Sequence, residues 1–567
     1  MASPWLTDEA RSARHAAVAR EAAAKFAAGA PLLECLHHVQ DSLGFLPRLA
    51  LEEFAFESRL AREQVWSAAS FYSNFRAEPP PVVEARVCTS VACHLRGGTE
   101  LQARLSVLAA KQPQDLGVKA AACLGACDQA PALLANGGLV SRADRLSGAE
   151  LVAVREVPVP AYERLGAYRA GGGMRLFESL ARERAFEPTI AALIGTGLRG
   201  MGGAGFSAGK KWEFVAKAQG SPKYVVVNAD EGEPGTFKDR WILERTPHRM
   251  LEGMLAAMLC VGADQAWIYV REEYAAARRA LAACLDELRE ARLLDAPLQN
   301  GRTLSARLVV GAGAYICGEE TALLESIEGK RGEPRLKPPF PAQFGLFGKP
   351  TLINNVETLW WVPEALGDPE TWKRSGTTAP GRKLYSVSGD VARPGVYELP
   401  LGTSLREIVA AAGGMEGDRA LKAFFPGGIS AGLLPASQQD VPMDFDALAK
   451  AGSMLGSGGV VVLDERRCVV DVAENCLSFF AHESCGKCTP CRVGTEKMLH
   501  AVREIRAGKA SPPTYSLMEA LSRTMAGASI CGLGQTAFLP FTSGLRYFRQ
   551  EYDEHLGGRC PTGACRP

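Results

Sequence analysis

The chain has 567 residues, of which 47% are hydrophobic, and its 64 Lys and Arg residues nearly balance its 63 Asp and Glu residues. A chain of this length can build several hydrophobic cores, so we expect about three to five domains. The balanced charge gives no reason to expect nucleic acid or an anionic membrane surface as a partner.

Neither a secretory signal nor a membrane span is predicted. The first residues of the chain mix acids and bases and lack the apolar run of a signal peptide. Glu252 and Asp264 interrupt the most apolar stretch, residues 250–270, which therefore indicates a buried helix and strand. The 16 cysteines cluster at metal-ligand spacings, which favours metal over disulfides and a location in the reducing cytoplasm.

Residues 1–78 are predicted to be helical. Pro31 stands at a helix start and Gly44 at its end, and apolar residues between them repeat on one face. From Val82 the pattern changes to short strands and one helix. Asn136-Gly-Gly is typical of a hairpin turn.

Four cysteines in this second region form two pairs. Cys88 and Cys93 follow one predicted strand at C-x4-C spacing, and Cys123 and Cys127 follow another at C-x3-C spacing. Two thiolates from each of two loops can converge on a 2Fe-2S cluster. The alternative is a set of buried free cysteines, which behave as small hydrophobic residues.

Residues 157–174, rich in Pro, Arg and Gly, are predicted to be a linker to a long α/β block. Near its start lies a glycine-rich loop that contains Gly200, Gly202 and Gly203 and ends at Lys211. Glycines let backbone N–H groups approach a phosphate or a flat ring. No clear strand precedes the loop and no Ser or Thr follows the lysine, so it is neither a Rossmann nor a Walker loop. It indicates a non-Rossmann nucleotide site, or else a plain flexible loop.

An acidic turn follows the predicted strand at residues 224–227. It contains Asn228, Asp230, Glu231 and Glu233. Carboxylates at a strand end can accept hydrogen bonds from ribose hydroxyls or a carboxamide, and the amide can bond a flavin edge. A solvated charged loop is the alternative, but the strand end and the neighbouring glycine loop favour a ligand site.

Two further patches have the same character. The first is a glycine turn that opens a helix, whose N-terminus is positively polarised, and it holds Tyr315, Gly318, Glu319 and Glu320. The second suits a sugar-phosphate tail and holds Phe340, Asn354, Asn355 and Thr358. Taken singly, Phe206, Phe214 and Phe340 read equally as residues of a hydrophobic core.

The C-terminal part is predicted to combine a small domain with a helical cysteine-bearing domain. Residues 384–450 contain short strands and a helix, Ser404 to Ala412, ended by two glycines, which suggests a β-grasp-like domain. Beyond it, three cysteines at C-x2-C-x2-C spacing and one distant cysteine suit a 4Fe-4S cluster: Cys485, Cys488, Cys491 and Cys531. Zinc and unligated thiols are the alternatives. Cys560 and Cys565 read as a tail that could bind metal only with partners elsewhere.

Together these features resemble the flavoprotein (NADH-dehydrogenase) subunit of respiratory complex I. Its relatives are the diaphorase subunits of NAD-reducing hydrogenases and of NAD-dependent molybdenum or tungsten formate dehydrogenases. The resemblance covers about residues 190–547, where the glycine loop, acidic turn, both patches and the C-x2-C-x2-C motif occur in order. Residues 20–150 resemble the thioredoxin-like 2Fe-2S subunit of the same assemblies, so the chain looks like a fusion of both.

The resemblance implies an α/β multidomain fold in six parts. They are a helical N-terminal segment (1–78), a thioredoxin-like 2Fe-2S domain (79–156), a linker (157–174), a non-classical Rossmann-like FMN- and NADH-binding domain (175–375), a β-grasp domain of the SLBB type (376–455) and a helical 4Fe-4S domain with a tail (456–567).

The resemblance also implies which residues contact the cofactors FMN and NAD(H). FMN contacts are expected from Gly200, Gly202, Gly203, Lys211, Asn228, Asp230, Tyr315, Gly318, Asn354, Asn355 and Thr358. NADH contacts are expected from Phe206, Phe214, Glu233, Glu320 and Phe340. Glu231 and Glu319 are expected to be further cofactor contacts. The family usually has Arg where this chain has Met201, which puts one phosphate contact in doubt.

The implied reaction is hydride transfer between nicotinamide and FMN, with no protein nucleophile or acid–base pair and with Glu233 positioning NADH. The 4Fe-4S cluster is then the first electron acceptor or donor and the 2Fe-2S cluster the second. Within the family, residues 411–437 and 485–495 most resemble the formate dehydrogenase branch, with hydrogenase and complex I as alternatives. The expected partners are an iron–sulfur and molybdenum- or tungsten-pterin large subunit, or hydrogenase subunits. An electron relay without nucleotide binding and a zinc-structured interaction protein are the other classes.

Overall fold

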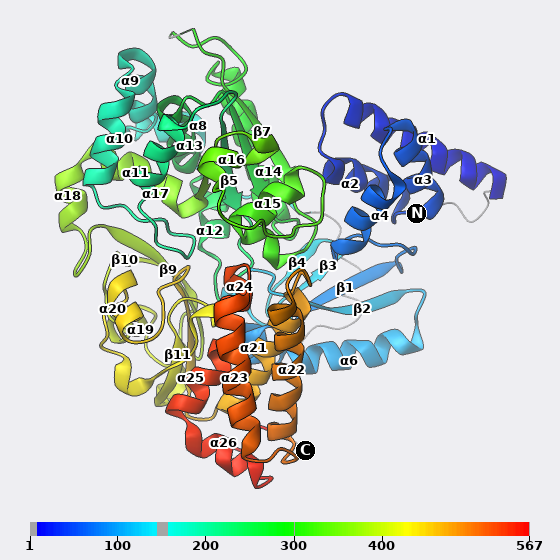
Figure 1. The fold of residues 1–567 in the computed structure, drawn as a ribbon, viewed down its shortest axis with the longest axis vertical. Coiled ribbons are helices and arrows are strands. Elements are labelled where there is room, and N and C mark those ends of the chain that lie inside the picture. Colours follow the sequence, from blue (N-terminus) through cyan, green and yellow to red (C-terminus); the bar gives the residue numbers. More distant parts are fainter. Residues whose placement is uncertain (1–7, 144–156, 300, 566–567) are drawn as a thin grey trace.

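The computed structural model describes residues 8–143, 157–299 and 301–565 (Figure 1). At the N-terminus, helices pack into a lobe of their own around Leu36 and Phe54, as predicted. They are α1 (Asp8–Ala27), α2 (Leu32–Leu43), α3 (Arg48–Glu57) and α4 (Arg62–Phe71). Gly44 ends α2 with φ of 86°, a left-handed conformation that favours glycine.

A small mixed sheet follows the N-terminal lobe. Its elements are β1 (Val83–Cys88), α5 (Val91–His94), α6 (Gly98–Lys111), β2 (Leu116–Ala121), η1 (Cys127–Gln129), β3 (Leu133–Ala135) and β4 (Gly138–Val140). The strand order is β2-β1-β3-β4, with β1 parallel to β2 and antiparallel to β3. Asn136 and Gly137 have φ of 47° and 86°, as a type I′ turn requires, so the predicted hairpin is confirmed.

The central domain is built on a parallel sheet of order β7-β6-β5-β8. Its strands are β5 (Tyr224–Ala229), β6 (Gln265–Val270), β7 (Ser305–Val310) and β8 (Thr351–Asn355). Its helices are α9 (Arg175–Glu183), α10 (Phe186–Gly195), α11 (Ala208–Lys217), α12 (Lys238–Arg245), α13 (Pro247–Val261), α14 (Ala275–Glu290), η3 (Tyr315–Gly318), α15 (Glu320–Ile327), α16 (Pro341–Phe344), η4 (Leu346–Gly348), α17 (Val356–Gly367) and α18 (Pro369–Arg374).

Both faces of this sheet are covered, which explains the uninterrupted apolar run of β5. Val225 and Val227 pack with α13 in one core, while Val226 packs with α15 in another. The apolar stretch at residues 250–270 is the buried helix α13 followed by β6, as predicted. Over its described residues, the chain has no helix that is both long and apolar enough to cross a membrane.

The segment predicted to be a linker packs onto the central domain. It contains α8 (Leu165–Ala170), and Met174 at its end is fully buried. The buried carboxylate of Glu252 on α13 accepts hydrogen bonds from the Tyr168 hydroxyl and, at 2.9 Å, from the Met174 N–H. An acidic residue inside an apolar helix thus fastens the incoming chain.

The β-grasp-like part forms a sheet of order β10-β9-β13-β11-β12. Its elements are β9 (Arg382–Gly389), β10 (Gly395–Pro400), α19 (Leu405–Ala411), η5 (Glu416–Asp418), β11 (Leu421–Phe425), η6 (Ile429–Ala431), β12 (Leu434–Pro435), η7 (Ala436–Gln438), α20 (Phe445–Lys450) and β13 (Gly459–Asp464). A capping box of Ser404 and Glu407 starts α19. The central strand β13 lies after residue 455, the predicted limit, because its apolar run completes the middle of this sheet.

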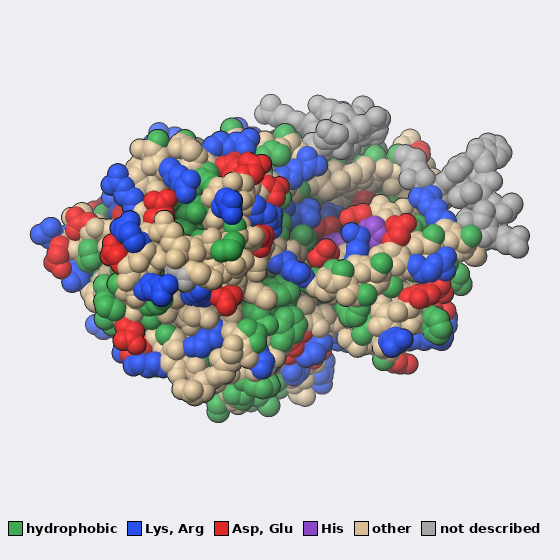
Figure 2. Space-filling view, turned by 90° about the horizontal axis from the view of Figure 1, so that it is seen from above, with side chains coloured by type: hydrophobic (Ala, Val, Ile, Leu, Met, Phe, Trp, Pro, Cys, Tyr) green, Lys and Arg blue, Asp and Glu red, His purple; other side chains and the backbone are tan. Residues whose placement is uncertain are grey.

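The last part is a bundle of helices beside the β-grasp sheet (Figure 1). Its helices are α21 (Val469–Glu483), α22 (Thr489–Arg506), α23 (Pro513–Ala528), α24 (Gly532–Thr536), α25 (Leu539–Tyr547) and α26 (Arg549–Leu556). Seen from above, the molecule has a hollow between its larger body and the N-terminal helices (Figure 2). A groove of about 1070 Å³ lies there, between α1 and α2 on one side and β6, β7 and α14 on the other.

Candidate functional site

The structure brings the four N-terminal cysteines together at the ends of β1 and β2. Cys88 is the last residue of β1, Cys93 lies in α5, and Cys123 and Cys127 stand on the loop after β2; all are buried. The sulfurs of Cys123 and Cys127 are 3.8 Å apart. The hydrogen bond shared with Cys93 lowers the pKa of the Cys88 thiol, which favours the thiolate that a metal binds.

Backbone N–H groups around these thiols fit a 2Fe-2S cluster. The Gly125 N–H donates to the Cys123 sulfur at 3.4 Å, and the N–H groups of Leu124 and Ser90 approach the Cys88 sulfur. Such donors stabilise cluster sulfurs and tune the reduction potential. A convergent, buried set of donors is more than free cysteines require.

Two arginines of the central domain hold the loop that bears Cys123. Arg271 donates to the Cys123 carbonyl oxygen at 2.6 Å, and Arg240 donates to the Gly125 carbonyl oxygen at 2.8 Å. Arg240 also pairs with Asp128 at 2.6 Å. Sequence reasoning missed both arginines. Their signal was positional, since Arg271 directly follows the apolar strand β6 and Arg240 directly follows the acidic turn.

The second set of cysteines lies where α21 gives way to α22. Cys485 follows α21, Cys488 is the N-cap of α22, Cys491 lies in the first turn of α22 and Cys531 is the N-cap of α24. The Cys531 sulfur is approached by the N–H groups of Leu533 and Gly534. A Cβ at Gly534 would lie 2.9 Å from Cβ of Cys491, so glycine lets these two segments meet. This loop and its donors fit a 4Fe-4S cluster.

The glycine loop is held over the end of β8 and the start of α17. A Cβ at Gly202 would lie 2.9 Å from Cβ of Asn355, whereas Gly203 has φ of 134° and open space around it. The N–H of Met201 donates to Thr358 Oγ1 at 2.8 Å. The Met201 side chain is buried, so the position where the family has Arg offers no charge to a ligand.

Three phenylalanines near the loop are exposed rather than part of a core. Phe206, Phe214 and Phe340 expose 51%, 47% and 53% of their surface, and the first two rings are 6.2 Å apart. Their burial in a core, the alternative that the sequence left open, is therefore wrong. Exposed rings grouped beside a glycine loop are suited to contact a flat ligand.

Two acidic residues beside these rings pair with lysines. Glu320 lies 2.9 Å from Lys211 and 3.1 Å from Lys337, and Glu319 lies 2.8 Å from Lys337. Burial opposes ionisation of Glu320, but the two lysines outweigh it and hold its pKa at about 2. The second Glu319 oxygen accepts from the N–H groups of Thr321 and Ala322 and caps α15.

Several of the predicted contact residues have structural partners of their own. Both Glu231 oxygens accept from the start of α12, at 2.9 Å from the Asp239 N–H and 3.1 Å from the Arg240 N–H. Asn355 caps α17, and Asn354 accepts from Trp212 at 2.9 Å. These side chains therefore shape the site from behind, whatever they contribute to a ligand.

Asp230, in contrast, has an oxygen to spare. Its Oδ2 is buried and has no hydrogen-bond partner among the described residues. The residue lines a cavity of about 320 Å³ together with Tyr315, Arg271 and Glu483. An unsatisfied buried acceptor costs free energy unless a donor reaches it, so this oxygen fits a donor from a bound cofactor. Asn228 lies nearby and donates to the Gly318 carbonyl oxygen at 2.8 Å.

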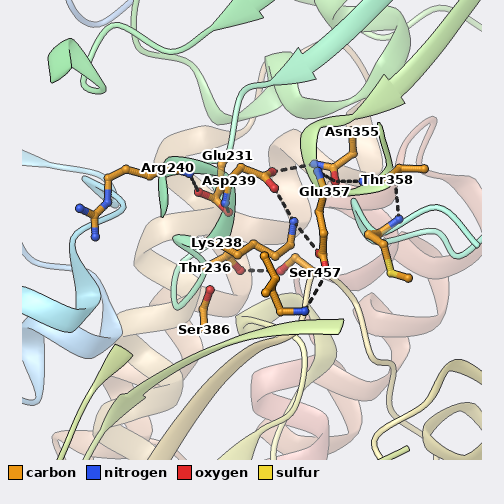
Figure 3. Close-up of polar contacts among 12 residues, drawn as sticks. Glu231, Thr236, Lys238, Asp239, Arg240, Asn355, Glu357, Thr358, Ser386 and Ser457 are labelled. Atoms are coloured by element: carbon orange, nitrogen blue, oxygen red, sulfur yellow. Dashed lines mark hydrogen bonds and ion pairs between the residues drawn. The ribbon is translucent and has the colours of Figure 1, made fainter. Parts of the chain in front are cut away.

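Beneath the glycine loop lies a buried network of charges that joins the central domain to the β-grasp sheet (Figure 3). Glu357 lies 3.2 Å from Lys238 and 2.9 Å from Lys383. Lys238 also lies 2.6 Å from Asp239, whose second oxygen accepts from Asn355 at 2.6 Å. The network thus links β9 to the residues that carry the glycine loop.

Replacing Asp230 by Asn should change how stability depends on pH. Burial raises the pKa of Asp230 from 3.8 to about 8. The folded form therefore binds a proton that the unfolded form releases, and stability is lost as pH rises from about 4 through about 8. In flavin-free protein, the denaturant midpoint should fall less between pH 5 and pH 8.5 for Asp230→Asn than for the wild type. Asp286→Asn, an exposed aspartate on α14, is the control, and equal slopes in all three proteins would contradict the assignment.

Four family models match the chain in the order of its structural parts. The thioredoxin-like 2Fe-2S ferredoxin model matches residues 19–154, and the Nuo51 FMN-binding domain model matches residues 195–364. The SLBB domain model matches residues 384–430. The iron-sulfur binding region of NADH-ubiquinone oxidoreductase-F matches residues 471–555. These matches confirm the predicted fold class and the cofactors FMN, NAD(H), 4Fe-4S and 2Fe-2S.

Curated relatives and solved structures agree with these models. One of the NADH-quinone oxidoreductase F subunits, that of Rhizobium meliloti numbered 2, is 47% identical over 73% of this chain and 99% of its own. Its counterpart from Streptomyces coelicolor is 45% identical over 70% of this chain and 89% of its own. A crystal structure of NAD+-reducing NiFe hydrogenase in the H2-reduced state is 35% identical, covers 92% of both chains and has a TM-score of 0.82. The chain belongs to the family of NADH-quinone oxidoreductase F subunits and is an NADH-oxidising flavoprotein subunit with iron–sulfur clusters.

Proposed function

We propose that this chain is the NAD(H)-reacting subunit of an assembly that oxidises formate, with the catalytic site for formate on a molybdenum- or tungsten-pterin partner. The observation that carries the first half is the exposed phenylalanine group beside the glycine loop and the buried free oxygen of Asp230. The second half is supported by the resemblance of residues 411–437 and 485–495 to the formate dehydrogenase branch.

The roles of individual residues follow from where they lie. Bound FMN exchanges hydride with nicotinamide and single electrons with iron–sulfur clusters, and this is the chemistry it supplies. The glycine loop and Asp230 bind the flavin, with N–H groups on one side and a carboxylate on the other. Phe206, Phe214 and Phe340 sandwich the nicotinamide nucleotide and exclude water from it.

The complete proposed set is as follows. FMN is held by Gly200, Gly202, Gly203, Lys211, Asn228, Asp230, Glu231, Tyr315, Gly318, Asn354, Asn355 and Thr358. NADH is held by Phe206, Phe214, Glu233, Glu319, Glu320 and Phe340. The cluster ligands are Cys88, Cys93, Cys123 and Cys127 for 2Fe-2S, and Cys485, Cys488, Cys491 and Cys531 for 4Fe-4S.

A second candidate is the equivalent subunit of an NAD-reducing hydrogenase. It is favoured by the likeness to the solved hydrogenase chain, which spans 92% of both chains and so includes the N-terminal fusion. Purification of the native complex distinguishes the two. Formate-dependent NAD+ reduction with molybdenum or tungsten in the complex supports our proposal, whereas hydrogen-dependent reduction with nickel would replace it. A chain that carries no flavin and bleaches no dye with NADH would reject both.

Replacing Glu233 by Ala should weaken NADH binding and leave FMN bound. The Glu233 carboxylate lies at the end of the acidic turn and is held by the Tyr315 hydroxyl at 2.6 Å and the Ser430 N–H at 2.8 Å. Burial raises its pKa, so its position between two domains is costly and serves a purpose beyond stability. We expect KM for NADH to rise about tenfold, equivalent to about 1.4 kcal/mol of binding energy. Flavin fluorescence after denaturation measures FMN, and Ser430→Ala, which keeps the carboxylate, is the control. Parallel loss of FMN and NADH binding would contradict this role.

A further inference from the structure

A second convergence of cysteines lies far from both cluster sites. The ligand atoms of Cys468, His555, Cys560 and Cys565 all lie within 4.8 Å of one another. Cys468 is the N-cap of α21, and His555 lies in the last turn of α26. The sequence left Cys560 and Cys565 as a tail that could bind metal only with partners elsewhere. The fold supplies those partners from positions up to 97 residues away.

The distances within this group suit one metal ion. Nε2 of His555 lies 3.5 Å from the sulfurs of both Cys468 and Cys565, and these sulfurs are 3.5 Å apart. With Zn–S bonds of about 2.3 Å and a Zn–N bond of about 2.0–2.1 Å, tetrahedral ligands lie about 3.5–3.8 Å apart. The thiolates of an iron–sulfur cluster bind different iron atoms and do not all converge so closely.

The histidine is oriented as a metal ligand. Its Nδ1 lies 2.6 Å from the Glu551 carbonyl oxygen, which can only accept a hydrogen bond, so Nδ1 carries the proton. The lone pair of Nε2 is therefore free to face the two sulfurs. A hydrogen bond from the second ring nitrogen to a carbonyl is how proteins usually fix a metal-binding imidazole.

The surroundings also suit a site with three thiolates. Cys468 and His555 are buried, whereas Cys560 and Cys565 are partly exposed and leave a path for an ion. Gly563 turns the chain between the two tail cysteines with φ of 67°. Arg506 hydrogen-bonds the Cys565 sulfur, so a positive charge offsets the net negative charge of one divalent ion and three thiolates.

We propose that Cys468, His555, Cys560 and Cys565 bind one Zn²⁺ in a closed, structural site. Four protein ligands complete the tetrahedron and leave no position for a substrate. The ion would fasten α26 and the following residues to the start of α21, at one pole of the molecule (Figure 1). The other end of α21 leads into the loop of Cys485, so the ion would fix the position of the helix that supports the 4Fe-4S cysteines.

The test is metal analysis of the full-length holoprotein purified from zinc-replete cells. We expect about one zinc per chain besides about six iron atoms for a 4Fe-4S and a 2Fe-2S cluster. X-ray absorption at the zinc edge should show three sulfur neighbours at about 2.3 Å and one nitrogen neighbour at about 2.0–2.1 Å. This spectrum comes from the wild type alone and does not depend on how any variant folds.

Variants then assign the ligands. The double variant Cys560→Ser, Cys565→Ser should lose the zinc and keep its iron, acid-labile sulfide and FMN. Cys260→Ser, which removes a buried thiol at the end of α13, should keep all of them. Wild-type protein without stoichiometric zinc, zinc that survives the double substitution, or a seventh iron lost with it would each overturn the zinc assignment.

Discussion

Replacing Cys491 by serine is expected to abolish the 4Fe-4S signal in electron paramagnetic resonance. Cys491 is 5% exposed and lies in the first turn of α22, between Cys488 at the N-cap and the packed Gly534. No other thiol can move into this place, because the helix backbone fixes it. The cluster should therefore be lost or converted rather than religated.

The same variant should keep its flavin and its reaction with NADH. The glycine loop and the acidic turn belong to a different sheet and share no backbone with α22. Reduction of a dye that reacts at the flavin should continue, while electron delivery to the partner subunit should fall to background. Cys476→Ala, a buried thiol on α21 outside both cysteine sets, is the matched control. An unchanged cubane spectrum in Cys491→Ser would reject this ligand set.

Replacing Glu357 by alanine is expected to destabilise the protein strongly. Glu357 is fully buried and is the shared partner of Lys238 and Lys383, which are also fully buried. Despite burial, these two lysines hold the pKa of Glu357 below its usual value, so the residue is charged in the folded protein. Removing one partner of a buried pair leaves an uncompensated charge and costs about 3–5 kcal/mol.

A denaturant titration measures this effect, and two variants frame it. Glu357→Gln keeps the hydrogen bonds without the charge and should fall between the wild type and Glu357→Ala. Glu370→Ala breaks an exposed pair with Lys373 and should cost no more than about 1 kcal/mol. A loss below about 1 kcal/mol in Glu357→Ala would mean that water or a neighbouring carboxylate already solvates the lysines.

Local signals in the sequence were enough to predict much of the fold. The Asn136-Gly137 turn, the capping residues of α19 and the apolar run of β5 each depend on a few adjacent residues, and each is confirmed. The two cysteine sets are likewise recognisable, because their members are close in sequence within each pair or triplet. Backbone preferences and ligand spacing act over short stretches of chain.

Features that depend on distant segments could not be predicted. Glu231 was expected to face a ligand, but its oxygens cap α12, a role that only the path of the chain after Gly235 reveals. The partners of Cys565 are Cys468 and His555, and nothing in the tail identifies them. The exposure of Phe206 and Phe214 is also a tertiary property, because an aromatic residue in an amphipathic stretch reads as core.

The two arginines that grip the Cys123 loop determine how the second cluster can work. Arg271 and Arg240 bind backbone carbonyl oxygens, which no rotation of a side chain can release. The thioredoxin-like part therefore does not swing as a mobile carrier between donor and acceptor. Its iron stays at a constant separation from the flavin side of the molecule, and any shuttling of charge must be done by electrons moving through a rigid scaffold.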